Sequence, residues 1–202
     1  SNLFQIPAQV SLAERLTQAS GLDAAFFCNS GAEANEAAIK LARKAADAEH
    51  PKIISFTQSF HGRTLATLTA TGQDKVKDGF DPLPEGFVTV EWGDVTALRQ
   101  AITPDTAAVL MEMVQGEGGL RPATPAWAEA VERVCRENDV LLIVDEIQTG
   151  MGRTGTMFAY ESYGVKPDLV TLAKGLGNGF PIGCLLATND VATHFNPGSH
   201  GS

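Results

Sequence analysis

Short apolar runs alternate along this chain with longer segments in which the apolar residues recur at helical spacing. The runs are bounded by Gly, Pro, Asn or Asp and predict strands at residues 24–28, 53–56, 87–90, 107–114, 140–145, 169–172 and 183–188. The helical spacing predicts helices at residues 10–19, 32–46, 94–102 and 125–138. Strands that alternate with helices indicate an α/β fold, with a mostly parallel sheet and helices on both of its faces.

Two charged residues stand at the ends of predicted strands. Asp145 closes the strand at 140–145, and Lys174 comes just after the strand at 169–172. Their separation is close to one strand-crossover-strand unit of roughly thirty residues. In a parallel sheet both side chains would reach the carboxyl edge, where open α/β sheets bind ligands. Taken alone, Lys174 also fits a surface lysine that opens a loop.

The segment SGAE at residues 30–33 lies between a predicted strand and the predicted helix at 32–46. Ser30 and Glu33 have the spacing of a capping box, which explains the segment structurally. The small residues Gly31 and Ala32 would also let an anion approach the N–H groups of the helix N-terminus. A lysine, an aspartate and an anion-binding helix terminus at one sheet edge are what pyridoxal 5′-phosphate requires.

Charge and cysteine usage exclude several other classes of protein. The net charge of −9 with no basic cluster argues against a nucleic-acid partner, and no apolar run is long enough to span a membrane. The three cysteines have no C-x-x-C spacing, and the four histidines have no metal-ligand spacing. We therefore expect no metal site, no membrane contact and a reducing, cytoplasmic location.

The segment GMGRTG at residues 150–155 matches the dinucleotide fingerprint G-x-G-x-x-G. The preceding strand ends at Asp145, however, so four residues intervene where the fingerprint should follow directly. Asp168 precedes the next strand instead of ending it, so the acid expected to bind ribose is misplaced. The spacing therefore disfavours dinucleotide binding.

Several motifs together resemble the class III, fold type I pyridoxal-phosphate-dependent aminotransferases. They are NSGAEANEAAIKLAR (29–43), SFHGRT (59–64), QGEGG (115–119), DEIQTGMGRTG (145–155) and AKG (173–175). The resemblance extends over essentially all 202 residues. It implies that the α/β fold is the large, cofactor-binding domain of such an enzyme.

The resemblance also implies roles for individual residues. Lys174 matches the lysine that binds the cofactor covalently and moves the proton between substrate and cofactor carbons. Asp145 matches the carboxylate that pairs with the pyridine nitrogen, and Gln148 the amide near the phenolic oxygen. The residues that match the phosphate loop are Ser30, Gly31 and Ala32.

Two further motifs match parts of the family that bind the cofactor ring and the substrate. Phe60 and His61 belong to the cofactor-binding motif, with Phe60 as the aromatic residue that stacks on the ring. An ordinary core phenylalanine is the alternative for Phe60. Arg63 matches the arginine that binds a substrate carboxylate, and Glu117 the glutamate that pairs with an arginine of the C-terminal domain.

The implied reaction transfers the δ-amino group of N-acetylornithine to 2-oxoglutarate in a homodimeric enzyme. Ornithine and succinylornithine are alternative donors, because Arg63 would bind a carboxylate that all of them carry. The chain begins without an initiator methionine and ends in a loop-like run at 198–202. We therefore expect residues 1–202 to be the large domain truncated at both ends, without the small C-terminal domain. Such a piece could also bind the cofactor without catalysing the reaction.

Overall fold

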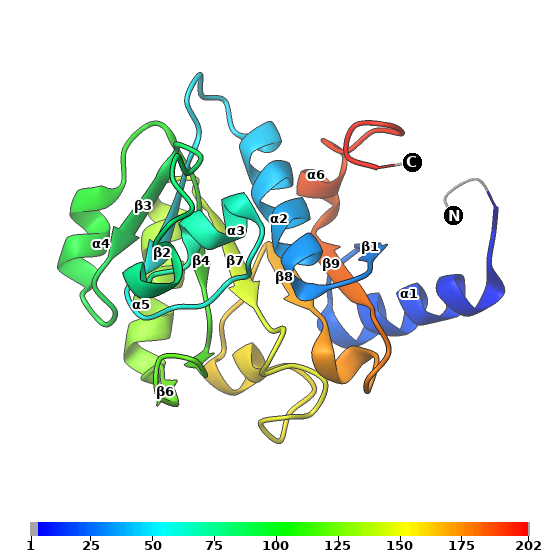
Figure 1. Ribbon diagram of the computed structural model, residues 1–202. Coiled ribbons are helices and arrows are strands. Elements are labelled where there is room, and N and C mark those ends of the chain that lie inside the picture. The colour runs from blue at the N-terminus through cyan, green and yellow to red at the C-terminus, as the bar shows by residue number, and fades with distance from the viewer. Residues whose placement is uncertain (1–3, 202) are drawn as a thin grey trace.

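The computed structural model describes residues 4–201 and has an α/β fold (Figure 1). The strands of its main sheet are β1 (Ala24–Cys28), β2 (Lys52–Phe56), β3 (Phe87–Val90), β4 (Thr106–Met111), β7 (Leu141–Asp145), β8 (Leu169–Leu172) and β9 (Gly183–Ala187). Their order across the sheet is β1-β9-β8-β7-β4-β2-β3. In this described sheet β9 pairs antiparallel with both β1 and β8, and the other neighbouring strands pair parallel. The predicted mostly parallel sheet is therefore confirmed.

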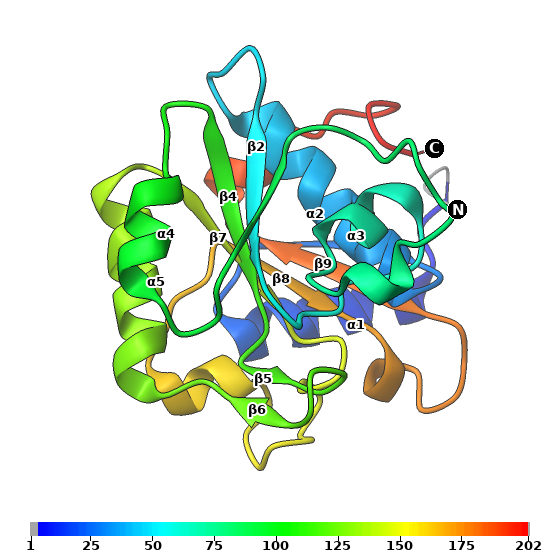
Figure 2. The same cartoon turned by 60° about the vertical axis from the view of Figure 1, so that its left-hand side comes forward.

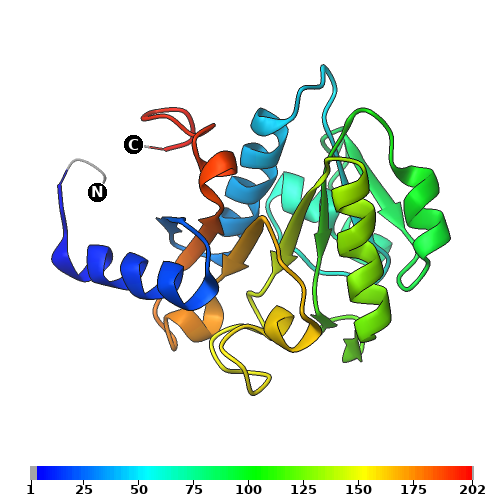
Figure 3. The ribbon, with the colours of Figure 1, turned by 180° about the vertical axis from the view of Figure 1, so that it is seen from behind.

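Helices cover both faces of the sheet, as Figure 2 shows. One face carries α1 (Pro7–Ser20), α4 (Val95–Ala101) and α5 (Pro125–Glu137), and Figure 3 shows α1 and α5 from this side. The other face carries α2 (Gly31–Ala45), α3 (Leu65–Ala70) and α6 (Asn189–Ala192). The strands alternate between the two cores: Leu142 and Val144 pack on the first face, and Ile143 packs on the second.

Helix ends follow local sequence signals. Thr124 caps α5 by accepting a hydrogen bond from the N–H of Trp127, and Pro125 occupies the first helical position. Helix α1 ends at Ser20 and is capped by Gly21, whose φ of 73° lies in the left-handed region that glycine adopts without strain. These signals explain why the predicted helix positions agree closely with the observed ones.

The strand predicted at 107–114 is wrong in its extent. Strand β4 ends at Met111, and β5 (Val114–Gln115) pairs with β6 (Arg121–Pro122) in a separate two-stranded sheet. The apolar run misled the prediction because Met113 is fully buried in the core although it lies outside the main sheet. The chain thus leaves the sheet at Glu112.

Several short elements were not predicted. They are α3, α6 and the 3-10 turns η1 (Asp74–Val76), η2 (Ala159–Tyr163) and η3 (Lys174–Leu176). Elements of three to six residues are too short to establish a helical period in the sequence. Among residues 4–201, no helix combines the length and apolarity needed to cross a membrane.

Candidate functional site

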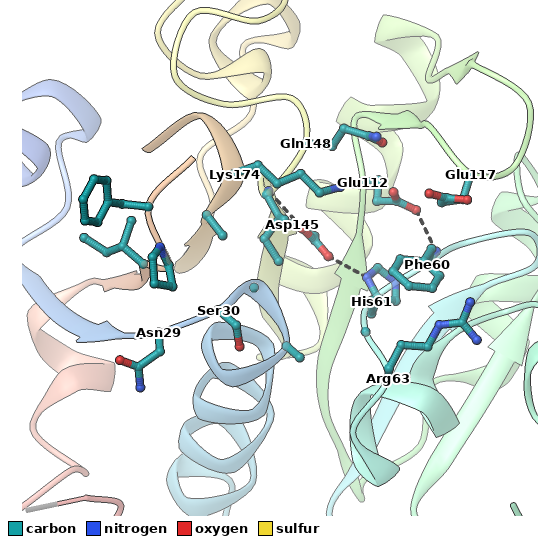
Figure 4. A pocket seen from close by; sticks show the side chains of 18 residues that line it. Asn29, Ser30, Phe60, His61, Arg63, Glu112, Glu117, Asp145, Gln148 and Lys174 are labelled. Atoms are coloured by element: carbon teal, nitrogen blue, oxygen red, sulfur yellow. Dashed lines mark hydrogen bonds and ion pairs between the residues drawn. The ribbon is translucent and has the colours of Figure 1, made fainter. Parts of the chain in front are cut away.

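A cavity of about 340 Å³ lies where the carboxyl ends of the parallel strands meet the N-terminus of α2 (Figure 4). All of the site residues predicted from the sequence line it: Ser30, Gly31, Ala32, Phe60, His61, Arg63, Glu117, Asp145, Gln148 and Lys174. Other lining residues were not predicted: Asn29, Gly62, Glu112, Ile147, Ala173, Phe180, Pro181 and Ile182. Its volume is in the range of small-molecule sites, roughly 300–1,000 Å³.

Lys174 enters this cavity from the end of β8, with Ala173 between it and the strand. Its φ of 40° lies in the left-handed region, which is uncommon for a residue with a side chain. The turn η3 holds this conformation, because the carbonyl of Lys174 accepts hydrogen bonds from the N–H groups of Gly177 and Asn178, each at 3.1 Å. Backbone strain of this kind persists where the surroundings enforce it, and it is concentrated at functional sites.

Asp145 enters from the end of the neighbouring strand β7 and is 4% exposed. Its Oδ2 accepts hydrogen bonds from Asn35 Nδ2 and His61 Nδ1, both at 2.8 Å. Its Oδ1 accepts one from the N–H of Ile147 at 3.0 Å. A carboxylate can accept about four hydrogen bonds. Asp145 therefore keeps an acceptor position on Oδ1 while it stands in a cavity wall.

Asn35 is a residue of this site that the sequence did not predict. It lies on α2, is fully buried and also donates from Nδ2 to the carbonyl of His61 at 2.7 Å. Thr171 on β8 donates its hydroxyl to Asn35 Oδ1 at 2.7 Å, which turns the amide NH₂ toward Asp145. The available signal was an asparagine that lies three residues from both Ala32 and Ala38, on the apolar face of α2.

The ring of His61 is completely buried beside Asp145. With an ionised aspartate, Nδ1 must carry the hydrogen that it shares with Oδ2. Among the described residues, Nε2 has no hydrogen-bond partner. The histidine thus supports Asp145 from inside the protein.

The N-terminus of α2 forms another wall, and it has the predicted capping box. The N–H of Glu33 donates to Ser30 Oγ at 3.2 Å, and Glu33 Oε2 accepts from the N–H of Asn29 at 2.7 Å. The first N–H groups of a helix have no intrahelical partner, so this end can bind an anion. A β-carbon at Gly31 would lie 2.9 Å from Ile147 Cδ1, so glycine is needed for the close packing here.

Phe60, Arg63, Gln148 and Glu117 form the outer part of the cavity. Phe60 is half-buried, and the Arg63 guanidinium carbon lies 5.4 Å from the centre of its ring. Gln148 and Glu117 are exposed, and Glu117 lies on the turn between β5 and β6. A β-carbon at Gly116 would overlap Gln148 Oε1, so this turn packs directly on the Gln148 amide.

Two glutamates near the cavity are almost completely buried. Glu146 accepts hydrogen bonds from the Thr149 hydroxyl and from the N–H groups of Ala159 and Tyr160, which holds the following loop. Burial nevertheless raises the pKa of Glu146. Glu112 lines the cavity, and burial raises its pKa to about 7.

In the part of the chain that the structure describes, no cluster of His, Cys, Asp and Glu could hold a metal ion.

Comparison with known families gives a match over residues 1–202 to the family described as Aminotransferase class-III. The chain belongs to the class-III aminotransferases. Among curated members, it is 57% identical to the acetylornithine aminotransferase of Halalkalibacterium halodurans and 54% identical to that of Bacillus subtilis. Each match covers 100% of this chain but only 52% of the relative. The chain therefore spans about half the length of these class-III enzymes.

Solved aminotransferase structures share the fold. An ornithine aminotransferase from Toxoplasma gondii superposes with a TM-score of 0.94 at 34% identity, over 99% of this chain and 49% of that one. The N-acetylornithine aminotransferase from Stenotrophomonas maltophilia superposes with a TM-score of 0.80 at 42% identity, over 96% of this chain and 49% of that one. A further structure of the T. gondii enzyme has partial occupancy of PLP at its active site.

Proposed function

We propose that residues 1–202 form the cofactor-binding domain of a pyridoxal-phosphate-dependent aminotransferase. The observation that carries this proposal is the meeting of Lys174 and Asp145, from adjacent parallel strands, in one cavity beside the N-terminus of α2. When bound, pyridoxal phosphate supplies a reactive aldehyde and a ring that accepts electrons.

The residues present fit this cofactor. Asp145 Oδ1 has a free acceptor position for a protonated ring nitrogen, and Lys174 lines the same cavity for a covalent bond to the cofactor. The phosphate would be bound at the helix terminus by Ser30, Gly31 and Ala32. The tight packing of Gly31 on Ile147 brings this terminus close to the loop that follows Asp145.

The remaining roles follow from the same placement. Phe60 and His61 would lie on the ring side, with His61 acting through Asp145, and Gln148 would donate to the phenolic oxygen. Lys174, once released from the cofactor, would take a proton from the substrate carbon and return it to the cofactor carbon. Arg63 would bind a substrate carboxylate with two parallel hydrogen bonds. Glu117 would pair with an arginine from outside these residues.

The proposed reaction transfers the δ-amino group of N2-acetyl-L-ornithine to 2-oxoglutarate, giving N-acetyl-L-glutamate 5-semialdehyde and L-glutamate, as in arginine biosynthesis. Relatives named acetylornithine aminotransferase at 50–57% identity support this donor. Ornithine or succinylornithine is the second candidate, supported by the ornithine aminotransferase fold neighbours. Initial rates with these three donors, measured on the intact gene product, would separate them.

We further propose a cytoplasmic homodimer for the intact protein, with neither nucleic acid nor membrane as a partner. The 202-residue chain alone would lack half the length of its relatives. We therefore expect it to bind the cofactor weakly and to transaminate negligibly. Cofactor titration with a turnover assay on both proteins would test this expectation, and equal values would contradict it.

The function itself is tested by trapping the cofactor. Borohydride treatment of the intact protein with pyridoxal phosphate should fix a pyridoxyl group on Lys174, located by peptide mapping. The variant Lys174→Arg should remain unlabelled, whereas Lys166→Arg, which changes an exposed lysine outside the cavity, should label normally. A label on Lys166 or elsewhere would contradict the assignment.

A further inference from the structure

Glu112 is a buried carboxyl group of the cavity that the proposed reaction does not use. It follows directly after β4 and is 6% exposed. Buried glutamates are rare unless they are paired or hydrogen-bonded, because removing the charge from water is unfavourable. A buried carboxyl group at this position therefore needs a hydrogen-bond or ion-pair partner.

Its contact is with the loop that carries Phe60. Glu112 Oε2 accepts a hydrogen bond from the backbone N–H of Phe60 at 3.2 Å, which is shown by a dashed line in Figure 4. Among the described residues this N–H is the one donor to the carboxyl group. The bond joins the loop after β2 to the end of β4.

The same loop is anchored on both sides of Phe60 by other bonds. Gln115 Nε2 donates to the carbonyl of Thr57 at 2.9 Å, and the N–H of His61 donates to Thr71 Oγ1 at 2.9 Å. Gln73 Nε2 donates to the carbonyl of Ser59 at 3.0 Å, and Glu112 accepts from the N–H of the same peptide unit, so the two bonds hold its two sides. The Phe60 ring extends from the backbone that this bond holds, and the Arg63 guanidinium carbon lies 5.4 Å from the centre of that ring.

We propose that Glu112 is a positioning residue, whose carboxyl oxygen holds the Phe60 backbone so that the ring faces the cavity. The consequence for cofactor binding rests on the proposed function, whereas the hydrogen bond does not. What matters for this role is the reach of the side chain and an acceptor oxygen, and the negative charge is dispensable. The charged and titratable groups that act on Glu112 are His61 from the loop after β2, Asp145 from β7 and Lys174 from η3.

Two substitutions separate reach from charge. Glu112→Gln keeps the length of the side chain and an acceptor oxygen but removes the charge. Glu112→Asp keeps the charge but shortens the side chain, so that the carboxyl group can no longer accept the hydrogen bond from the Phe60 N–H. A positioning role predicts that the glutamine variant behaves like the wild type and the aspartate variant does not; a charge role predicts the reverse.

The first measurement is amide hydrogen exchange at Phe60 in the cofactor-free intact protein. Loss of this hydrogen bond should accelerate exchange roughly tenfold in Glu112→Asp, and exchange in Glu112→Gln should stay near the wild type. Glu91→Asp is the matched control, because Glu91 accepts a hydrogen bond from the hydroxyl of Thr57 in the same loop, whereas the Phe60 N–H donates to Glu112. Unchanged exchange in Glu112→Asp, or equal acceleration in both Glu112 variants, would overturn the proposal.

The second measurement connects the bond to the ring. The dissociation constant for pyridoxal phosphate should rise about tenfold in Glu112→Asp, but should not rise further when Glu112→Asp is added to Phe60→Ala. Additive effects would overturn the proposal that Glu112 acts through Phe60. Failure of the wild type to bind the cofactor would refute the proposed function alone, since the exchange result stands without it.

Discussion

The carboxyl ends of β7 and β4 lie side by side in the sheet, and each carries a buried acid. Asp145 is the last residue of β7, and Glu112 directly follows β4. Met111 on β4 is paired with Val144 on β7, so Glu112 and Asp145 occupy equivalent positions along neighbouring strands. Asp145 accepts three hydrogen bonds, from Asn35, His61 and Ile147. Glu112 accepts one, from Phe60.

This difference assigns the two acids to different tasks. Hydrogen bonds to a carboxylate favour its charged form, whereas burial without them favours the neutral form. The β7 end carries a carboxyl group with three donors around it and an open acceptor position on Oδ1, which suits a cationic partner. The β4 end carries an acid whose pKa burial raises to about 7, which suits an acceptor for a neutral N–H group.

The largest expected effect comes from removing the charge of Asp145. In Asp145→Asn the amide oxygen can replace Oδ2 and still accept from Asn35 and His61. The amide NH₂ then replaces Oδ1, so the acceptor for the Ile147 N–H and the open acceptor position are both lost. We expect kcat/KM for transamination by the intact protein to fall roughly 10³-fold, or about 4 kcal/mol of transition-state stabilisation. Cofactor absorbance should confirm that binding is partly retained.

The matched variant Glu112→Gln removes a charge one strand away. Its loss of kcat/KM should be less than about tenfold, since its oxygen still accepts from Phe60. If Asp145→Asn stayed within tenfold of the wild type, or if both variants lost activity equally, the distinction between the two strand ends would be wrong.

The sequence predicted the first of these acids and missed the second, for a physical reason. Asp145 is the last residue of β7 and Lys174 lies two residues after β8, so each comes directly after a short apolar stretch. Glu112 interrupts an apolar run that continues through the buried Met113. Apolar periodicity reports burial, and burial here continues after the strand has stopped.

The sequence also located the capping box of α2 but did not show what lies opposite the helix. The contact of Asn35 with Asp145 joins residues that are distant along the chain, so it depends on how α2 packs on β7 and β8. Local patterns therefore identified the elements and the strand-end chemistry. The hydrogen-bond network that distinguishes the two acids required the tertiary structure.

An intermediate effect is expected in the pH dependence of stability. Burial raises the pKa of Glu112 from 4.5 to about 7, so the folded protein holds this proton more tightly than the unfolded chain. The contribution of this bound proton to the free energy of unfolding is fully present below pH 4.5 and is lost as the pH rises through about 7. The side chain of Glu112→Gln does not titrate in this range. The free energy of unfolding of this variant should therefore increase relative to that of the wild type as the pH rises, by at most about 3 kcal/mol.

Denaturant unfolding of the cofactor-free intact protein at pH 4 and pH 8 measures this gain. The exposed Glu91→Gln is the control, and its difference from the wild type should be much smaller at both values. If Glu112→Gln and the wild type had parallel stability profiles, the carboxyl group would not be the buried, weakly hydrogen-bonded acid described here.

The smallest expected effect comes from Thr171, the register partner of Asp145 on β8, whose side chain acts on Asp145 through Asn35. Thr171 donates to Asn35 Oδ1 and, together with the bond from Asn35 Nδ2 to the carbonyl of His61, sets which end of the amide faces Asp145. Thr171→Val keeps the shape of the side chain but removes this bond. The amide could then turn its oxygen toward Asp145, which would weaken the three-donor arrangement.

We expect Thr171→Val to lower the free energy of unfolding by about 1–2 kcal/mol and to reduce kcat a few-fold with little change in KM. The control Thr69→Val removes a hydroxyl bond of equal length, 2.7 Å to the carbonyl of Leu65, at a half-buried position in α3. It should lose some stability but keep its kcat. A Thr171→Val enzyme with unchanged kcat would mean that Asp145 holds its charge without an oriented Asn35, and the hydrogen bonds from His61 and Ile147 would then be sufficient.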